Sequence, residues 1–134
     1  MHTTDYSSTF IEVADDCTEE SGVVPPERTG RTVARIHYDL LASKPYGYTS
    51  DEVVFAAFAE KHGLEAGELD EARREFFSKG QPCLRSSPLG KRYGWGIHFD
   101  EASRVAIYGK DTPEYEQYRD DRSLTHLKAM KSRR

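Results

Sequence analysis

The sequence has few of the features that assign a chain to the secretory pathway or to a redox class. Cys17 and Cys83 are its only cysteines, they lie far apart in the chain, and neither belongs to a C-x-x-C pair. Isolated cysteines of this kind are typical of a reduced protein in which each thiol acts as a small apolar side chain. We therefore expect a cytoplasmic location.

Long hydrophobic runs and an excess of basic charge are also absent. No apolar stretch approaches the roughly 20 residues of a membrane-spanning helix, and the polar segment Met1 to Phe10 has no hydrophobic region of a secretory signal. The 19 Lys and Arg are outnumbered by 23 Asp and Glu, which gives a net charge of −4. General nucleic-acid and membrane-surface binders are usually basic. The composition therefore predicts a soluble protein with no membrane partner and argues against nucleic acid as its main partner.

Metal and nucleotide motifs are missing as well. The five histidines form no H-x-H or H-x-x-x-H pair, and no cysteine lies at zinc-ligand spacing. The sequence contains neither G-x-x-x-x-G-K-[ST] nor G-x-G-x-x-G. We predict no metal site, and no pattern names a cofactor or an oligomeric state.

A chain of 134 residues is long enough for one hydrophobic core, so residues 1–134 are expected to form a single domain. The first thirty residues are acidic and partly irregular. Within them, Thr9 to Val13 is predicted to form a short strand, and Asp15 to Thr29 a surface loop that contains Pro25-Pro26.

Hydrophobic spacing predicts three helices in the middle of the chain. The second helix begins with the capping-box pair Thr49 and Glu52, and it is apolar around nearly its whole circumference, which is typical of a central helix. The expected ranges are Val33–Leu41, Thr49–Gly63 and about Gly67–Lys79.

After Pro82 the hydrophobic period changes from helical to two-fold. Arg92–Phe99 and Arg104–Tyr108 alternate as the strands of a β-hairpin, and Cys83–Arg85 is a plausible third strand. Thr112-Pro113-Glu114 is a strong helix start, and a last short helix is expected from Ser123, with Leu124, Leu127 and Met130 as its apolar side chains.

The predicted fold class is therefore α+β, with helices followed by a small antiparallel sheet and a C-terminal helix. The central helix is expected to pack on the sheet face that holds Trp95, Ile97, Val105 and Ile107.

One segment differs in chemistry from the rest, because Ser78 to Phe99 contains no acidic residue. If Trp95 and Ile97 face the core, Gly94 and Gly96 leave a bare strip of backbone on the other face, which admits a ligand or a packed helix. Guanidinium groups suit phosphate and carboxylate, and aromatic rings suit a flat group. We predict a binding site for a small anionic ligand, nucleotide-like or carboxylate-like, formed by Lys79, Gln81, Arg85, Lys91, Arg92, Tyr93, Trp95 and His98.

Three alternatives stay open for this segment. In the first, it is structural: the glycines admit a helix and the arginines pair with acids of the N-terminal loop. In the second, the protein is an enzyme in which Cys83 is a nucleophile and His98 its base. In the third, the basic patch and the basic C-terminal tail form a nucleic-acid or protein interaction module.

Several stretches between Thr9 and His98 resemble a small bacterial and fungal family of unknown function, DUF6157. The resemblance covers most of the chain and is most specific in its longest stretch, Phe77 to His98. Since the family has no established activity, the resemblance implies kinship and no function. The matching stretches include Thr9–Ala14, Val24–Pro26, Thr32–Ala34, Pro45–Asp51, Phe77–Arg85, Ser87–Leu89 and Lys91–His98.

Overall fold

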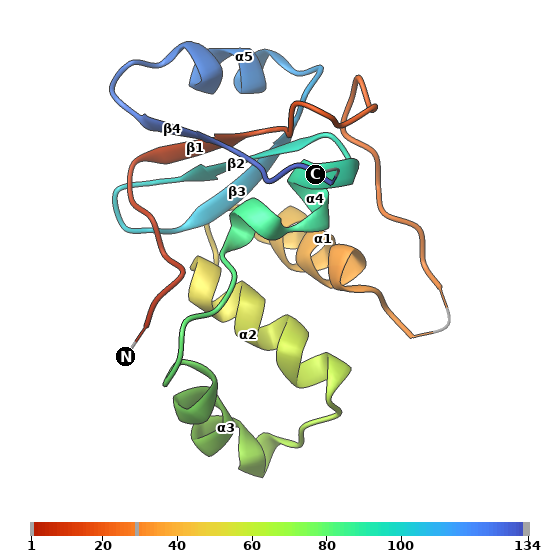
Figure 1. Cartoon of the computed structure of the whole chain (residues 1–134), viewed down its shortest axis with the longest axis vertical. Coiled ribbons are helices and arrows are strands. Elements are labelled where there is room, and N and C mark those ends of the chain that lie inside the picture. Colours follow the sequence, from red (N-terminus) through yellow and green to blue (C-terminus); the bar gives the residue numbers. More distant parts are fainter. Residues whose placement is uncertain (1, 29, 133–134) are drawn as a thin grey trace.

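The computed structural model describes residues 2–28 and 30–132, and it confirms the α+β class. A four-stranded mixed sheet has helices on both of its faces (Figure 1). The strands are β1 (Thr9–Glu12), β2 (Trp95–Phe99), β3 (Val105–Gly109) and β4 (Thr125–Lys128). The helices are α1 (Val33–Ser43), α2 (Ser50–Lys61), α3 (Leu69–Phe76), α4 (Pro88–Arg92) and α5 (Pro113–Asp120), with 3-10 helices at Ala66–Glu68 and Leu84–Ser86.

The first strand lies in the interior of the sheet, whose order is β3-β2-β1-β4. β1 pairs antiparallel with β2, where Ile11 faces Ile97, and parallel with β4, where Ile11 faces Leu127. The predicted hairpin is confirmed as β2 and β3, although its first strand begins at Trp95 and not at Arg92, because Arg92 is the last residue of α4. The sheet is nevertheless mixed and not purely antiparallel, and its strands are interleaved with the helices along the chain.

Alternation along β1 supplies two separate cores. Ile11 joins Leu41, Leu89 and other apolar side chains on the side of α1 and α4, whereas Phe10 packs against Tyr115 of α5 on the opposite side. Figure 1 shows α5 alone over its face, with α1 and α4 over the other and α2 and α3 farther out. The expectation that the central helix covers the sheet is therefore met only in part: α1 and α4 take most of that place, while α2 packs mainly on α1 and reaches the core of the sheet with Val53.

Helix starts follow the predicted capping chemistry. The Thr49 hydroxyl accepts a hydrogen bond from the Glu52 N–H at 3.2 Å, and the Glu52 carboxylate accepts one from the Thr49 N–H at 2.9 Å. Thr112 caps α5 in front of Pro113 in the same way. The third predicted helix is shorter than expected at both ends: residues 66–68 form a 3-10 turn before α3, and α3 ends at Phe76 and not at Lys79.

The predicted last helix is replaced by a strand. Leu124 and Leu127 have helical spacing, but they contact different cores: Leu124 packs beside Phe10 on the α5 side and Leu127 on the opposite side. An extended segment can divide two apolar side chains between two faces in this way, and it also completes the outer edge of β1. Met130 is 51% exposed.

The predicted strand Cys83–Arg85 is also wrong. The segment forms a 3-10 turn at Leu84–Ser86, in which the Ser86 N–H and hydroxyl both donate to the Cys83 carbonyl. α4 follows directly. Ser87 is its N-cap and Pro88 its first residue.

The glycines that were expected to leave an open strip are covered. A Cβ built on Gly96 would lie 2.6 Å from side-chain atoms of both Phe10 and Tyr115, and one on Gly94 would lie 2.2 Å from the Ser21 carbonyl oxygen. The strip therefore admits α5, as the structural alternative proposed, and also the N-terminal loop, and it leaves no room there for a ligand. The other half of that alternative is not met, because among the described residues neither Arg85 nor Arg92 pairs with an acid of the loop.

We predict that Gly96→Ala lowers the free energy of unfolding by about 1–3 kcal/mol, because overpacking forces rings or backbone to shift. Urea denaturation followed by circular dichroism measures the change. Gly80→Ala is the matched control, since a Cβ on Gly80 meets no atom within 4 Å. Equal stability of the two variants would contradict the close packing of α5 on β2.

Candidate functional site

The eight residues predicted to bind a ligand do not gather in one cleft. Lys79 and Gln81 line one small hollow, and Arg92 and Tyr93 line another. Each hollow adjoins a third, central one, which is lined by α1, α2, α3 and the start of α4. Four of the predicted residues therefore lie near the central hollow, in two separate pairs.

The other predicted residues lie elsewhere. Arg85 Nε donates a 2.9 Å hydrogen bond to the Lys128 carbonyl, which ties it to the strand β4. Trp95 Nε1 donates to the Val23 carbonyl at 2.8 Å, so its polar atom secures the N-terminal loop. Lys91 is half-buried on α4 and does not line the hollows described above.

His98 lies on the face of the sheet that α5 covers, opposite to the face that holds Trp95. Its Nδ1 lies 2.8 Å from the Tyr46 hydroxyl, and its ring stacks on Tyr118 of α5 at 4.0 Å between centroids. Cys83 lines the central hollow on the other side, where its Sγ lies 3.3 Å from the Tyr6 hydroxyl. The sheet separates the two side chains, so they do not meet the contact requirement for a nucleophile and its base.

Around His98, tyrosines form a polar cluster under α5. The Tyr46 hydroxyl contacts those of Tyr108 and Tyr118 at 2.9 and 3.3 Å. Burial is the main cause that raises the pKa of Tyr46 well above its ordinary value, and the hydrogen bonds with these two hydroxyls raise it further. Burial also lowers the pKa of His98. Tyr46 also has a left-handed backbone, φ 60°, so this network holds a strained residue in place.

The central hollow, which we call the helix cavity, has a volume of about 310 Å³. Its walls are mostly apolar and come from both helical layers. The lining residues are Val33, His37, Val54, Ala57, Phe58, Lys61, His62, Phe76, Pro82, Cys83, Ser86, Ser87 and Pro88. A concave apolar space with few polar groups is the usual form of a small-molecule site.

A buried histidine and serine form the polar part of this wall. His37 Nδ1 lies 2.9 Å from the Ser87 hydroxyl, and the two residues are only 5% and 2% exposed. The Ser87 oxygen also accepts the Leu89 N–H at 3.2 Å as the N-cap of α4. Burial lowers the pKa of His37 to about 4, so the ring is neutral at physiological pH.

A second hollow next to the helix cavity carries cationic side chains. It is lined by Arg28, Arg92 and Tyr93 together with the first residues of α1, and its volume is about 320 Å³. Val33 and Pro88 line both this space and the helix cavity, so the two adjoin. We call the second space the arginine hollow, and the two together the helix groove.

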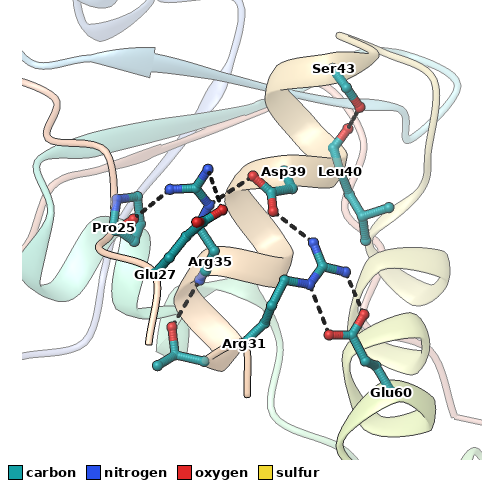
Figure 2. A network of polar contacts seen from close by, with 9 residues as sticks. Pro25, Glu27, Arg31, Arg35, Asp39, Leu40, Ser43 and Glu60 are labelled. Carbon is teal, nitrogen blue, oxygen red and sulfur yellow. Dashed lines mark hydrogen bonds and ion pairs between the residues drawn. The ribbon is translucent and has the colours of Figure 1, made fainter. Parts of the chain in front are cut away.

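Two other arginines near the groove pair with acids. Figure 2 shows Arg31 between Asp39 of α1 and Glu60 of α2, while Arg35 bonds Asp39 at 2.9 Å and pairs with Glu27. The Arg31 guanidinium holds the pKa of the Glu60 carboxyl below its usual range. By contrast, neither Arg28 nor Arg92 has a carboxylate partner among residues 2–28 and 30–132.

Comparison with protein families agrees with the resemblance in the sequence. The model of a family of unknown function, DUF6157, matches residues 1–134. The chain belongs to this family. No curated protein and no solved structure is significantly similar to this DUF6157 chain.

Two structural findings concern membranes and metals. In the part of the chain that the structure describes, no helix is long and apolar enough to cross a membrane. Among the same residues, no group of three or more His, Cys, Asp or Glu side chains could hold a metal ion. Cys17 and Cys83 are both free thiols.

His37 and Ser87 were not predicted, although the sequence carries a signal for each. His37 lies four residues after Val33 and four before Leu41, which places it inside the apolar stripe of α1. Ser87-Pro88 has the form of an N-cap followed by a first-turn proline. The sequence does not predict that the two residues contact each other, because His37 belongs to α1 and Ser87 caps α4.

The low pKa of His37 predicts a pH-dependent stability. An unfolded chain protonates His37 near pH 6.5, whereas the folded chain does so only near pH 4, so the free energy of unfolding falls as the pH drops through this window. The loss attributable to His37 amounts to about 3 kcal/mol.

Urea unfolding at pH 7, 5.5 and 4.5 checks this for the wild type and for His37→Gln, which lacks the titrating ring. We expect the wild type to lose more stability than the variant between the highest and the lowest pH. Parallel losses in the two proteins would contradict a buried, neutral His37.

Proposed function

We propose that this DUF6157 protein binds a small organic anion with an apolar body in the helix groove. The proposal depends on one observation: the apolar helix cavity adjoins the cationic arginine hollow. The helix cavity is apolar, the arginine hollow has two cations, and Val33 and Pro88 line both. A ligand that fills both would place its apolar body among the helices and its charge beside the arginines.

The apolar part of the ligand is argued from the cavity walls. Phe58 and Phe76 lie 4.7 Å apart between ring centroids and form one wall, with Val33 and Val54 on the side of α1 and α2. Transfer of apolar surface from water into such a space is favourable by about 25 cal/mol for each Å². A ring or short alkyl chain therefore suits the cavity better than a sugar or a free phosphate.

The anionic part is argued from the charges at the groove. Arg31 and Arg35 pair with acids, but Arg28 and Arg92 carry no such pair within the described chain. In a protein with a net charge of −4, two unpaired guanidinium groups beside one hollow are a local reversal of sign. Guanidinium groups bind carboxylate, sulfonate or phosphate through paired donors.

The proposal keeps part of the site that the sequence suggested. Arg92 and Tyr93 belong to the arginine hollow, and Lys79 and Gln81 line the separate small hollow that adjoins the helix cavity at Phe58 and Phe76. Trp95 is left out because its Nε1 bonds the Val23 carbonyl, and His98 because it stacks on Tyr118 of α5, on the opposite face of the sheet. We also propose a cytoplasmic location, where two free thiols remain reduced.

The test uses two fluorescent probes that share an apolar body and differ in charge. Anilinonaphthalene sulfonate is anionic, and phenylnaphthylamine lacks the sulfonate. We expect the folded wild type to bind the anion more tightly, and Arg92→Ala or Arg28→Ala to weaken anion binding about tenfold with little effect on the neutral probe.

Arg122→Ala is the matched control, because Arg122 is exposed and lies outside the groove. It changes the net charge by the same amount as the test variants. If Arg122→Ala weakens the sulfonate probe as much as Arg92→Ala does, the effect comes from overall charge and the groove is not the site. Absence of binding by either probe also rejects the proposal.

A further inference from the structure

We propose that His37 Nε2–H is a ligand-selecting hydrogen-bond donor inside the helix cavity. The ligand is then an organic acid whose apolar body carries a hydrogen-bond acceptor, of which a carbonyl between two apolar groups is the simplest form. This inference rests on the proposed function and adds the chemical class of the ligand. It is carried by the geometry around His37 and Ser87.

A chain of hydrogen bonds determines which ring nitrogen holds the proton. The Leu89 N–H donates to the Ser87 oxygen at 3.2 Å, so this hydroxyl already serves as an acceptor. Its own proton has one acceptor among the described residues, the His37 Nδ1 at 2.9 Å. Ser87 is 2% exposed, and a buried hydroxyl proton left without an acceptor is costly. Nδ1 therefore accepts, and a neutral ring must carry its proton on Nε2.

The second nitrogen is open to the cavity. In the described part of the chain, Nε2 has no hydrogen-bond partner. Every side-chain nitrogen or oxygen there that is sealed, meaning inaccessible to solvent, does have a partner. Nε2 is therefore not sealed, although His37 as a whole is 95% buried, as its exposure of 5% shows. Since His37 lines the helix cavity, the open atom faces that space.

Other polar side chains of the cavity wall bond elsewhere in the chain or lie at its exposed rim. The Ser86 hydroxyl donates to the Cys83 carbonyl at 2.8 Å, and His62 Nδ1 donates to the Phe58 carbonyl at 2.9 Å. At the rim, Lys61 Nζ donates to the Arg31 carbonyl at 3.0 Å. His37 and Ser87 are the buried polar residues of this wall, and the Ser87 hydroxyl proton is already donated, so the Nε2–H of His37 is the buried donor that a ligand inside the cavity would meet.

Such a donor discriminates between ligands of the same shape. A ligand with an acceptor at this place satisfies Nε2–H, whereas a ligand with a methylene there removes the N–H from water and leaves it unpaired. Sites built around a hydrogen bond reject analogues that lack the partner group much more strongly than they reject a change in apolar size. We therefore expect a preference of at least about tenfold for the ligand with the acceptor.

The experiment compares benzoylbenzoates with benzylbenzoates, which differ only by a carbonyl or a methylene between two rings. The ortho, meta and para isomers vary the spacing from the carboxylate to that group. Calorimetry on the wild type is expected to show one benzoylbenzoate at least about tenfold tighter than its benzyl counterpart. In His37→Phe the two should bind equally, and in His37→Gln, whose amide can donate, part of the preference should return.

Nitrogen NMR of the imidazole rings supplies a readout that needs no variant. The wild type should show His37 with its proton on Nε2, and this proton should shift on addition of the preferred benzoylbenzoate but not of its benzyl counterpart. A proton on Nδ1 overturns the inference, and so does equal binding of every matched pair.

The two proposals fail in different ways. If anilinonaphthalene sulfonate binds in an Arg92-dependent manner but no benzoylbenzoate is preferred, the groove binds anions and the inference on His37 is wrong. If neither the sulfonate nor any of the benzoates binds, the proposed function falls and the inference falls with it.

Discussion

The position of β1 in the interior of the sheet is the constraint on which the rest of the fold depends. Its antiparallel partner is β2 and its parallel partner is β4, so the beginning and the end of the chain must meet before the sheet is complete. Its side chains alternate between two cores, with Phe10 under α5 and Ile11 under α1 and α4. The segment before it is tied to α2, because the buried Asp51 carboxylate accepts the Thr4 N–H at 2.6 Å.

This sheet divides the molecule into two chemically different sides. Under α5, the Tyr46 hydroxyl contacts His98 Nδ1 and the Tyr108 hydroxyl, and Tyr115 packs so closely on Gly96 that no ligand fits between them. On the other side, α1, α2 and α4 meet around the helix groove, where apolar walls adjoin two unpaired arginines. Ser87 connects the two helices that border the groove, because it caps α4 and bonds His37 of α1.

Local signals predicted much of the fold and part of the candidate site. Thr49 and Thr112 cap helices as their spacing suggested, and the alternation from Trp95 onward forms the hairpin. Arg92 and Tyr93 lie at the helix groove, but His98 does not, because strand alternation sends it to the face opposite to Trp95. The lack of acidic residues from Ser78 to Phe99 predicts a local excess of positive charge, but it does not predict which of these side chains lie on the same side of the molecule.

The sequence by itself determined the starts of α1, α2 and α5, the alternation of β1, β2 and β3, and the lack of acids from Ser78 to Phe99, since these depend on residues close together in the chain. Only the tertiary structure decided that Thr125–Lys128 is a strand beside β1, that α1 covers the sheet in place of α2, and that His37 meets Ser87. Each of these depends on contacts between segments far apart in sequence, where burial of apolar surface and the need to pair buried polar groups outweigh local preference.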